Sequence, residues 1–270
     1  MSRFDCSFDD CYDHWDKTLE YLPESSECLE LKTYEYYEFE GCFCTIKCLP
    51  DTCLCLGRSG THYTFKEQQI LDSYSICETD IRKPIYECND NCGCSGKLCG
   101  NRLVQCGPRK GLKIVEYDVK GLSLITTTSI SAGNFVCEYA GVIITRDMAK
   151  KRYPLYKEKY GKNYIFCINE QFGEDTYKTI IDPTECGNIG RYINHSCGPN
   201  CSLYVIRIRN GLPKLCIFAN EDISDGDEIC FNYGDNILNV DTKEPVNPIH
   251  CVCGKLNCKK YLPFDCSCFD

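Results

Sequence analysis

Short hydrophobic runs separated by turn residues fill the middle of the chain. They all fall within residues 112 to 236 and read "LKIVEY", "GLSLITTT", "NFVCEYAGVII", "NYIFCI", "YKTIID", "CSLYVIRI", "PKLCIFA" and "EICFNY". Runs of this length that are rich in β-branched and aromatic residues predict strands, so we expect a mostly β domain. Asn210-Gly211 lies between two of the runs and predicts a hairpin there.

One stretch has a helical pattern. Residues 145 to 160, "TRDMAKKRYPLYKEKY", begin with Thr145, which is a good N-cap residue. Proline lacks a backbone donor and clashes with the preceding turn, so we expect Pro154 to interrupt this helix.

The two ends of the chain have a different composition. Residues 1 to 40 are acidic and aromatic and form an N-terminal extension, either as short structured pieces packed on the body or as a solvated acidic arm. The sequence contains no run of about 18 apolar residues, so no membrane-spanning helix is expected. The first ten residues lack the pattern of a secretory signal, so we expect none.

Cysteine is the outlier in the composition, with 26 residues in 270. In a chain without a secretory signal, metal ligation is a better reading than disulfides. Nine thiols are too few for three separate tetrahedral zinc ions, but they suffice if three sulfurs bridge two ions each. The alternative is a set of scattered buried thiols. The nine are Cys42, Cys44, Cys48, Cys53, Cys55, Cys88, Cys92, Cys94 and Cys99.

A second group of thiols follows the strand-rich region. "CVCGKLNC" supplies Cys251, Cys253 and Cys258, one short of a tetrahedral zinc site. We expect the fourth ligand to be Cys197 of "RYINHSCGPNC"; Cys266 or Cys268 is the alternative. A zinc ion there would tie the C-terminal tail to the loop that carries a neighbouring Asn and His.

The charge balance bears on the partner. The formal net charge is −9 and the sequence pI is about 5.1. This argues against a protein whose main task is binding nucleic acid. We therefore expect no direct binding of nucleic acid. It favours a basic partner, because complementary charge speeds encounter.

These motifs together resemble SET-domain lysine methyltransferases. "RYINHSCGPN" is similar to the family's cofactor motif and "EICFNYG" to its C-terminal catalytic motif, with "KGLSL" and "EYAG" in the family's order. The nine-cysteine block resembles the pre-SET module, and "CVCGKLNC" the post-SET module. The resemblance implies a pre-SET module at 41–105, a SET domain at 106–236 and a post-SET module at 237–270. The SET domain would consist of small twisted sheets with a knot-like C-terminal threading.

The resemblance also implies a methyl donor, S-adenosylmethionine, and four zinc ions, three of them in the pre-SET module. Tyr233 would be the catalytic tyrosine, and Phe231 would leave room for di- or trimethylation. His195 could alternatively ligate metal. Two departures stand out: Gly-Leu-Ser replaces the family's usual Gly-Trp-Gly, and Val142 stands where an acidic residue is common. The implied donor-site residues are Lys120, Gly121, Leu122, Ser123, Tyr164, Arg191, Asn194 and His195, and Tyr164 would also belong to the catalytic centre.

The substrate implied by the resemblance is a histone tail that docks as an extended strand. The favoured site is lysine nine of histone three, which would place the protein on chromatin in the nucleus. Two alternatives remain open: methylation of a non-histone protein, and a catalytically silent binding module that keeps the zinc scaffold.

Overall fold

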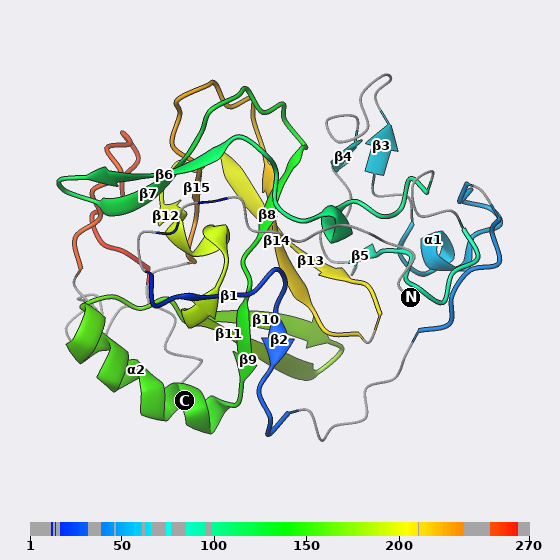
Figure 1. Ribbon diagram of the computed structural model, residues 1–270, viewed down its shortest axis with the longest axis horizontal. Coiled ribbons are helices and arrows are strands. Elements are labelled where there is room, and N and C mark those ends of the chain that lie inside the picture. Colours follow the sequence, from blue (N-terminus) through cyan, green and yellow to red (C-terminus); the bar gives the residue numbers. More distant parts are fainter. Residues whose placement is uncertain are drawn as a thin grey trace.

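A computed structural model gives the architecture of the chain (Figure 1). It describes residues 12, 14, 17–31, 39–45, 47–60, 63–65, 74–76, 85–94, 99–209, 211–234 and 249–263. The helices are α1 (Leu54–Ser59) and α2 (Arg146–Tyr160). The strands are β1 (Glu20–Tyr21), β2 (Ser26–Glu27), β3 (Tyr63–Phe65), β4 (Tyr74–Ile76), β5 (Ile85–Tyr86), β6 (Leu112–Tyr117), β7 (Gly121–Thr126), β8 (Phe135–Glu138), β9 (Gly141–Ile144), β10 (Phe166–Phe172), β11 (Asp175–Gly187), β12 (Asn194–His195), β13 (Cys201–Arg207), β14 (Lys214–Ala219) and β15 (Cys230–Phe231).

The described part of the chain is mostly β, which confirms the prediction, and it is divided among small sheets. One sheet has five strands in the order β1-β11-β9-β2, with β10 also pairing with β11, and another has four in the order β5-β13-β14-β8. Three two-stranded sheets, β6-β7, β12-β15 and β3-β4, complete the set. The strand runs expected between residues 112 and 236 all contribute strands. Asn210 of the expected hairpin lies outside the described residues, but β13 and β14 on either side of it pair antiparallel.

One predicted run, "NFVCEYAGVII", forms two strands in two different sheets. Its first half, β8, pairs with β14, and its second half, β9, pairs with β11. Gly141, where the second strand begins, packs so closely that an added Cβ would lie 2.6 Å from the backbone nitrogen of Pro183. A hydrophobic run buried throughout cannot show from sequence where it passes from one sheet to the next.

Helix α2 begins as expected, because the Thr145 side chain accepts a hydrogen bond from the backbone N–H of Met148. The expected interruption is wrong: the helix runs through Pro154 to Tyr160. Ala149 and Tyr156 are its buried residues and face the sheet, while Pro154 is exposed. Proline on the solvent side leaves the buried contacts of a helix intact, and here they hold it together.

The described part of the N-terminal extension is structured and packs on the body. β1 pairs parallel with β11, beside the part of that strand that pairs with β10, and β2 pairs parallel with β9 at the other edge of the five-stranded sheet. The extension therefore contributes a strand at each end of this sheet. Residues 17 to 31 are therefore structured pieces packed on the body, and the alternative of a solvated acidic arm is wrong for them. The rest of the extension lies largely outside the described residues.

The loop before β13 and the segment after β14 meet in the parallel pair β12-β15, which aligns Asn194 with Cys230 and His195 with Phe231. The largest hydrophobic core lies directly behind this pair and includes Leu124, Ile181 and Ile217. Two cysteine-rich segments flank this β region, one on each side in sequence. No helix in the described ranges is long and apolar enough to cross a membrane.

Candidate active site

A cavity of about 340 Å³ opens beside the β12-β15 pair. Its walls come from the β6-β7 turn, the segment that follows α2, the loop around residues 191 to 195, and tail residues 249 to 263. The volume falls within the usual range for small-molecule sites. Tyr139 and the segment of Phe231 and Tyr233 complete the lining. A site built from segments so far apart in sequence depends on the tail staying in place.

Aromatic rings line one part of this cavity. The Phe231 ring lies with its centroid 5.0 Å from that of Tyr233 and 6.1 Å from those of Tyr139 and Phe166. Phe231 is 1% exposed, so its position is fixed by the core. The Tyr139 hydroxyl donates to the backbone carbonyl of Tyr164 at 2.6 Å and holds that segment against the ring cluster.

Tyr233 is anchored at both its backbone and its hydroxyl. The hydroxyl donates to the carbonyl of Ile193 at 2.7 Å, and the backbone N–H donates to Nδ1 of His195 at 3.2 Å. Burial, followed by the nearby Cys230 and Tyr164, raises the pKa of Tyr233 above its ordinary value. The side chain is therefore a neutral phenol at physiological pH.

Arg191 shapes the opposite wall. Its guanidinium donates to the carbonyls of Pro183 at 3.0 Å and Thr184 at 3.2 Å. The same group stacks over the Tyr164 ring, with Cζ 4.4 Å from the ring centroid. Although it is 7% exposed, the guanidinium has carbonyl partners on one side and an aromatic face on the other.

Asn194 is held by the "GLS" segment that departs from the family pattern. Its Nδ2 lies 2.7 Å from Ser123 Oγ, 3.2 Å from the carbonyl oxygen of Leu122 and 3.3 Å from Glu228 Oε1. Lys120 pairs with the other carboxylate oxygen of Glu228 at 2.5 Å. Ser123 is fully buried, so the hydroxyl fits within the fold and supplies an acceptor there.

Cys197 meets the three tail thiols. The sulfurs of Cys197, Cys251, Cys253 and Cys258 all lie within 4.8 Å of one another, and those of Cys197 and Cys251 are 3.8 Å apart. Four sulfurs bound at 2.3 Å to one tetrahedral zinc lie about 3.8 Å apart, so the group fits such an ion. Asn257 Nδ2 donates to the carbonyl of Cys197 and adds a second tie between tail and loop.

His195 lies between the thiol group and Tyr233. Its Nδ1 accepts from the backbone of Tyr233, so Nε2 carries the proton and points at Cys197 Sγ, 3.3 Å away. Burial and then the charge of Lys259 lower the pKa of His195 to about 4, which keeps the ring neutral. A neutral ring in this position can donate to the sulfur and orient the thiol.

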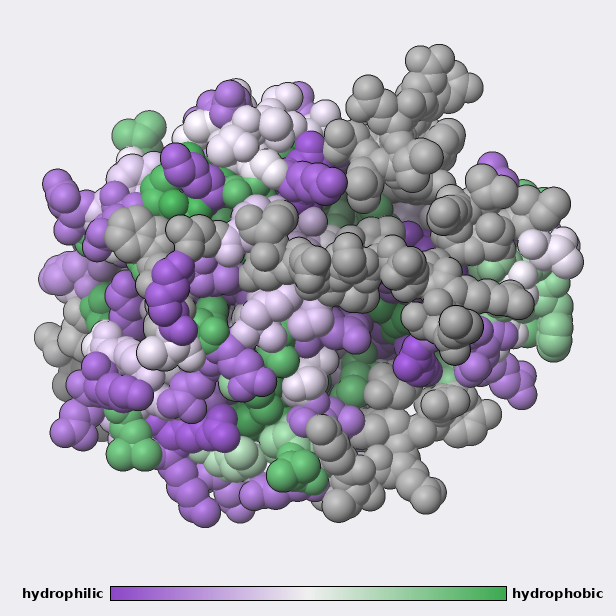
Figure 2. All heavy atoms as spheres, viewed as in Figure 1, coloured by the Kyte–Doolittle hydropathy of each residue, from purple (hydrophilic) through white to green (hydrophobic). Residues whose placement is uncertain are grey.

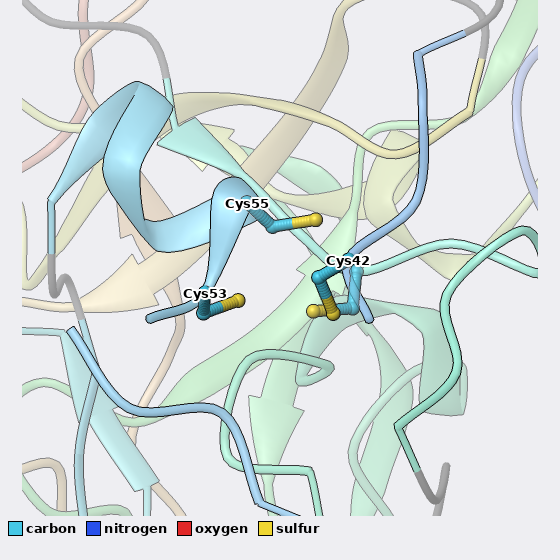
Figure 3. A group of neighbouring side chains, drawn as sticks. Cys42, Cys53 and Cys55 are labelled. Atoms are coloured by element: carbon cyan, nitrogen blue, oxygen red, sulfur yellow. The ribbon is translucent and has the colours of Figure 1, made fainter. Parts of the chain in front are cut away.

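The nine-cysteine block forms one sulfur cluster. Figure 3 shows Cys53 and Cys55, at the start of α1, with their sulfurs directed toward Cys42 on a separate segment of the chain. Three four-thiol groups have all their sulfurs within 4.8 Å. Cys48, Cys53 and Cys88 each belong to two of these groups and Cys42 to all three, so the sulfurs lie close enough for some of them to be shared between ions. The groups are Cys42, Cys53, Cys55 and Cys88; Cys42, Cys48, Cys88 and Cys94; and Cys42, Cys44, Cys48 and Cys53.

The remaining two thiols join the same cluster. Cys99 Sγ lies 3.5 Å from Cys48 Sγ, and Cys92 Sγ lies 3.6 Å from Cys55 Sγ. Clustered soft thiolates suit zinc, so the residues fit a structural multi-zinc site.

Comparison with known proteins identifies the family to which the chain belongs. The SET domain family matches residues 121–234. A probable histone-lysine N-methyltransferase, set-23 of Caenorhabditis briggsae, is 36% identical over 233 residues, covering 85% of this chain and 90% of its own length. The chain belongs to the SET-domain histone-lysine methyltransferase family.

Other SET relatives agree. The histone-lysine N-methyltransferase SETMAR of Rattus norvegicus is 36% identical over 248 residues, covering 86% of this chain and 74% of that protein. The crystal structure of the methyltransferase domain of human SETMAR matches with a TM-score of 0.75 at 33% identity, covering 92% of this chain and 90% of that one.

A more distant SET structure carries ligands. KRYPTONITE in complex with mCHH DNA, an H3(1-15) peptide and SAH matches with a TM-score of 0.70 at 26% identity, over 91% of this chain and 48% of that one. Because that complex contains DNA, the expectation that this chain does not bind nucleic acid finds no support.

The structure brings most of the expected SET site residues to one cavity. Gly121 and Ser123 do not line it, although Ser123 supports Asn194 from behind. Cys266 and Cys268 lie outside the described residues. The expected residues that line the cavity are Lys120, Leu122, Tyr164, Arg191, Asn194, His195, Phe231 and Tyr233.

Several residues at the site were not expected. Tyr139 belongs to "EYAG", and its aromatic side chain beside a family motif was the available signal. Glu228 precedes β15, pairs with Lys120 and lies within hydrogen-bond distance of Asn194. Ile249 and Val252 belong to the tail and line the cavity. No sequence pattern marks them, because their role depends on where the thiol group holds the tail.

Proposed function

We propose that this protein is an S-adenosylmethionine-dependent histone-lysine N-methyltransferase. The observation that carries the proposal is the cavity itself, where SET motif residues, a ring cluster around Tyr233 and the thiol-fastened tail meet. The residues proposed to contact the donor are those from the β6-β7 turn, Tyr164 and the 191–195 loop.

The donor would supply a methyl group on a positively charged sulfonium. The cavity fits such a group in volume and offers both apolar walls and polar groups from Asn194 and Arg191. The SAH held by the KRYPTONITE structure supports this assignment. The departure at Gly121-Leu122-Ser123 leaves the cavity open, because Leu122 lines it and Ser123 packs behind it.

The lining also suits an amine nucleophile. Free lysine has a pKa near 10.4, so the substrate must lose a proton before it attacks. None of the described residues that line the cavity is Asp or Glu, whereas Lys162 and Arg191 are among them. Lys120 also lines it, but its charge is paired with Glu228. Apolar rings and positive charges both disfavour an ammonium ion, so the site favours the neutral amine. We assign Tyr233 the role of orienting that amine, with Tyr164 beside it.

We assign the substrate as a histone tail, with lysine nine of histone three as the favoured position. An H3(1-15) peptide is present in the KRYPTONITE complex, and that stretch includes lysine nine. The net charge of −9 favours encounter with a basic tail. Such a substrate would place the protein in the nucleus on chromatin.

The product state follows from Phe231. A phenyl ring has no hydroxyl to hold a water molecule beside the amine, so space remains for further methyl groups. We propose di- or trimethylation. Phe231→Tyr would then shift products toward monomethylation, as measured by mass spectrometry of the product peptide.

We further propose four zinc ions: three in the pre-SET module at 41–105 and one in the post-SET module at 237–270, which close on the SET domain at 106–236. The nine clustered thiols would hold the three, and Cys197 with the tail thiols the fourth. Closed all-sulfur sites are structural, so these ions would organise the fold and take no part in the methyl transfer.

The experiment combines labelled donor with separate histones and, in parallel, with a nuclear extract. Labelling of histone H3 supports the proposal, and labelling confined to non-histone proteins would overturn the substrate assignment. The rival function, a silent binding module, is tested by isothermal titration with S-adenosylmethionine. Absence of donor binding at high protein concentration would favour the module.

A further inference from the structure

Positive charge is concentrated on helix α2. Residues 146 to 162 contain seven of the chain's 30 basic residues and two of its 39 acidic ones, in a protein with a net charge of −9. The helix lies on the outside of the molecule, where hydrophilic side chains cover the surface (Figures 1 and 2).

Three of these basic residues share one face of the helix. Arg146, Lys150 and Lys157 are spaced i, i+4 and i+11, which places them within about 40° of one another around the axis. All three are exposed. At 1.5 Å per residue they span about 16 Å, and we call them the basic ridge.

Among the residues that the structure describes, no acidic side chain pairs with the basic ridge. Arg152, on the same helix, pairs with Asp182 at 2.8 Å, and Lys159 lies 4.0 Å from Glu185. Within the described ranges none of the three ridge residues has an ion-pair partner. Their charge is therefore available to an external ligand.

The basic ridge also lies close in sequence to the active site. Helix α2 ends at Tyr160, and Gly161, its C-cap in the left-handed conformation, turns the chain into residues 162 to 164, which line the cavity. A polyanion on α2 would therefore lie near a bound substrate. In its natural setting, a histone tail emerges from a particle wrapped in DNA.

We infer that the basic ridge binds the phosphate backbone of duplex DNA beside the substrate tail. The inference rests on the proposed function, because the substrate is what brings DNA to this face. Contacts from Lys and Arg to phosphate release counterions and read no sequence. A span of about 16 Å covers roughly five base pairs at 3.4 Å each. The net charge of −9 averages over the molecule and hides this local surface.

The test measures the anisotropy of a fluorescent DNA duplex with the full chain over a salt series. The variant is Arg146→Gln/Lys150→Gln/Lys157→Gln. Each lost phosphate contact lowers the slope of log K against log salt by about 1, so we expect a decrease of about 3 in magnitude. The matched control removes three exposed lysines elsewhere, at Lys110, Lys113 and Lys178, and should leave the slope unchanged.

Methylation assays separate this inference from the proposed function. The ridge variant should methylate a free H3 peptide at the wild-type rate and nucleosomes more slowly. Absence of duplex binding by the wild-type chain, or equal losses in the ridge and control variants, would overturn the inference. A loss on nucleosomes with unchanged duplex binding would also overturn it and indicate an acidic protein surface as partner. Inactivity of the wild type on the peptide would instead count against the proposed function.

Discussion

At the scale of single residues, the site depends on how Asn194 is held. Its Nδ2 has three acceptors, and the closest is the buried hydroxyl of Ser123 at 2.7 Å. The hydroxyl stands at a position where the family usually has glycine. The serine therefore adds a side chain where glycine has none, and this side chain orients Asn194, a residue proposed to contact the donor.

Ser123→Ala should weaken donor binding. Loss of one buried hydrogen bond costs about 1 kcal/mol, which corresponds to roughly fivefold in the dissociation constant. Isothermal titration with S-adenosylmethionine measures it, with exposed Ser131→Ala as the control. Equal affinities for Ser123→Ala and the wild type would show that the hydroxyl does not position Asn194.

Tyr233→Phe should lower turnover on an H3 peptide by on the order of 100-fold. The change removes the hydroxyl that donates to Ile193 at 2.7 Å and leaves the ring contact with Phe231 in place. Initial rates at saturating donor measure the effect, and Tyr177→Phe, at an exposed tyrosine, is the control. Unchanged turnover would refute the assigned role.

At the scale of elements, the N-terminal segment completes the five-stranded sheet. Besides β1 and β2, it contributes Glu24, which pairs with Lys214 of β14 at 2.6 Å. Lys214 also pairs with the buried Glu138 of β8 at 3.1 Å, and the backbone of Ser25 donates to the same carboxylate. One lysine thus fastens the segment to two strands of the neighbouring sheet.

Lys214→Met should destabilise the fold by about 3 kcal/mol. The substitution keeps the apolar stem but leaves the carboxylate of Glu138, which is 7% exposed, without its cation. Urea unfolding followed by circular dichroism gives the free energy of unfolding. Lys113→Met, on an exposed strand position, should change it little, and equal values for the two variants would argue against the fastening role.

Local patterns predicted the elements well and their pairing poorly. Thr145 fixed the start of α2 and the run "LKIVEY" matched β6 from end to end. The interruption expected at Pro154 was wrong. Whether a proline breaks a helix depends on the tertiary contacts that hold the rest of the helix in place, and the local sequence does not show these contacts. The assignment of β8 and β9 to different sheets likewise depends on partners far away in sequence.

The site was predictable where chemistry dictates residue type. Thiol spacing pointed to both sulfur groups, and the family motifs pointed to Asn194, His195 and Tyr233. Glu228 and the tail residue Ile249 were not predicted to belong to the site, because residues of these common types gain a role there only through their position in the fold.

At the scale of the whole molecule, the tail is fastened over the cavity by one thiol group. Tail residues 249 to 263 contain only an isolated β-bridge, His250 to Tyr261, among the described residues. A segment with so little structure of its own would depend on the proposed zinc ion to stay in place.

Cys197→Ser should lower bound zinc by one ion per chain and free the tail. Plasma emission analysis counts the metal, and hydrogen exchange over residues 249 to 263 should become faster. Cys186→Ser, a thiol outside both sulfur groups, should change neither quantity. Full metal content in Cys197→Ser would place the fourth ligand elsewhere.

The most direct measurement of the central claim is mass spectrometry of a histone peptide array after incubation with the protein and S-adenosylmethionine. The account predicts one or more added methyl groups on a lysine of histone H3, chiefly lysine nine and with di- or trimethylated product. It also predicts that Tyr233→Phe abolishes most of the signal. An array without methylated peptides, despite a zinc-loaded protein that binds the donor, would contradict it.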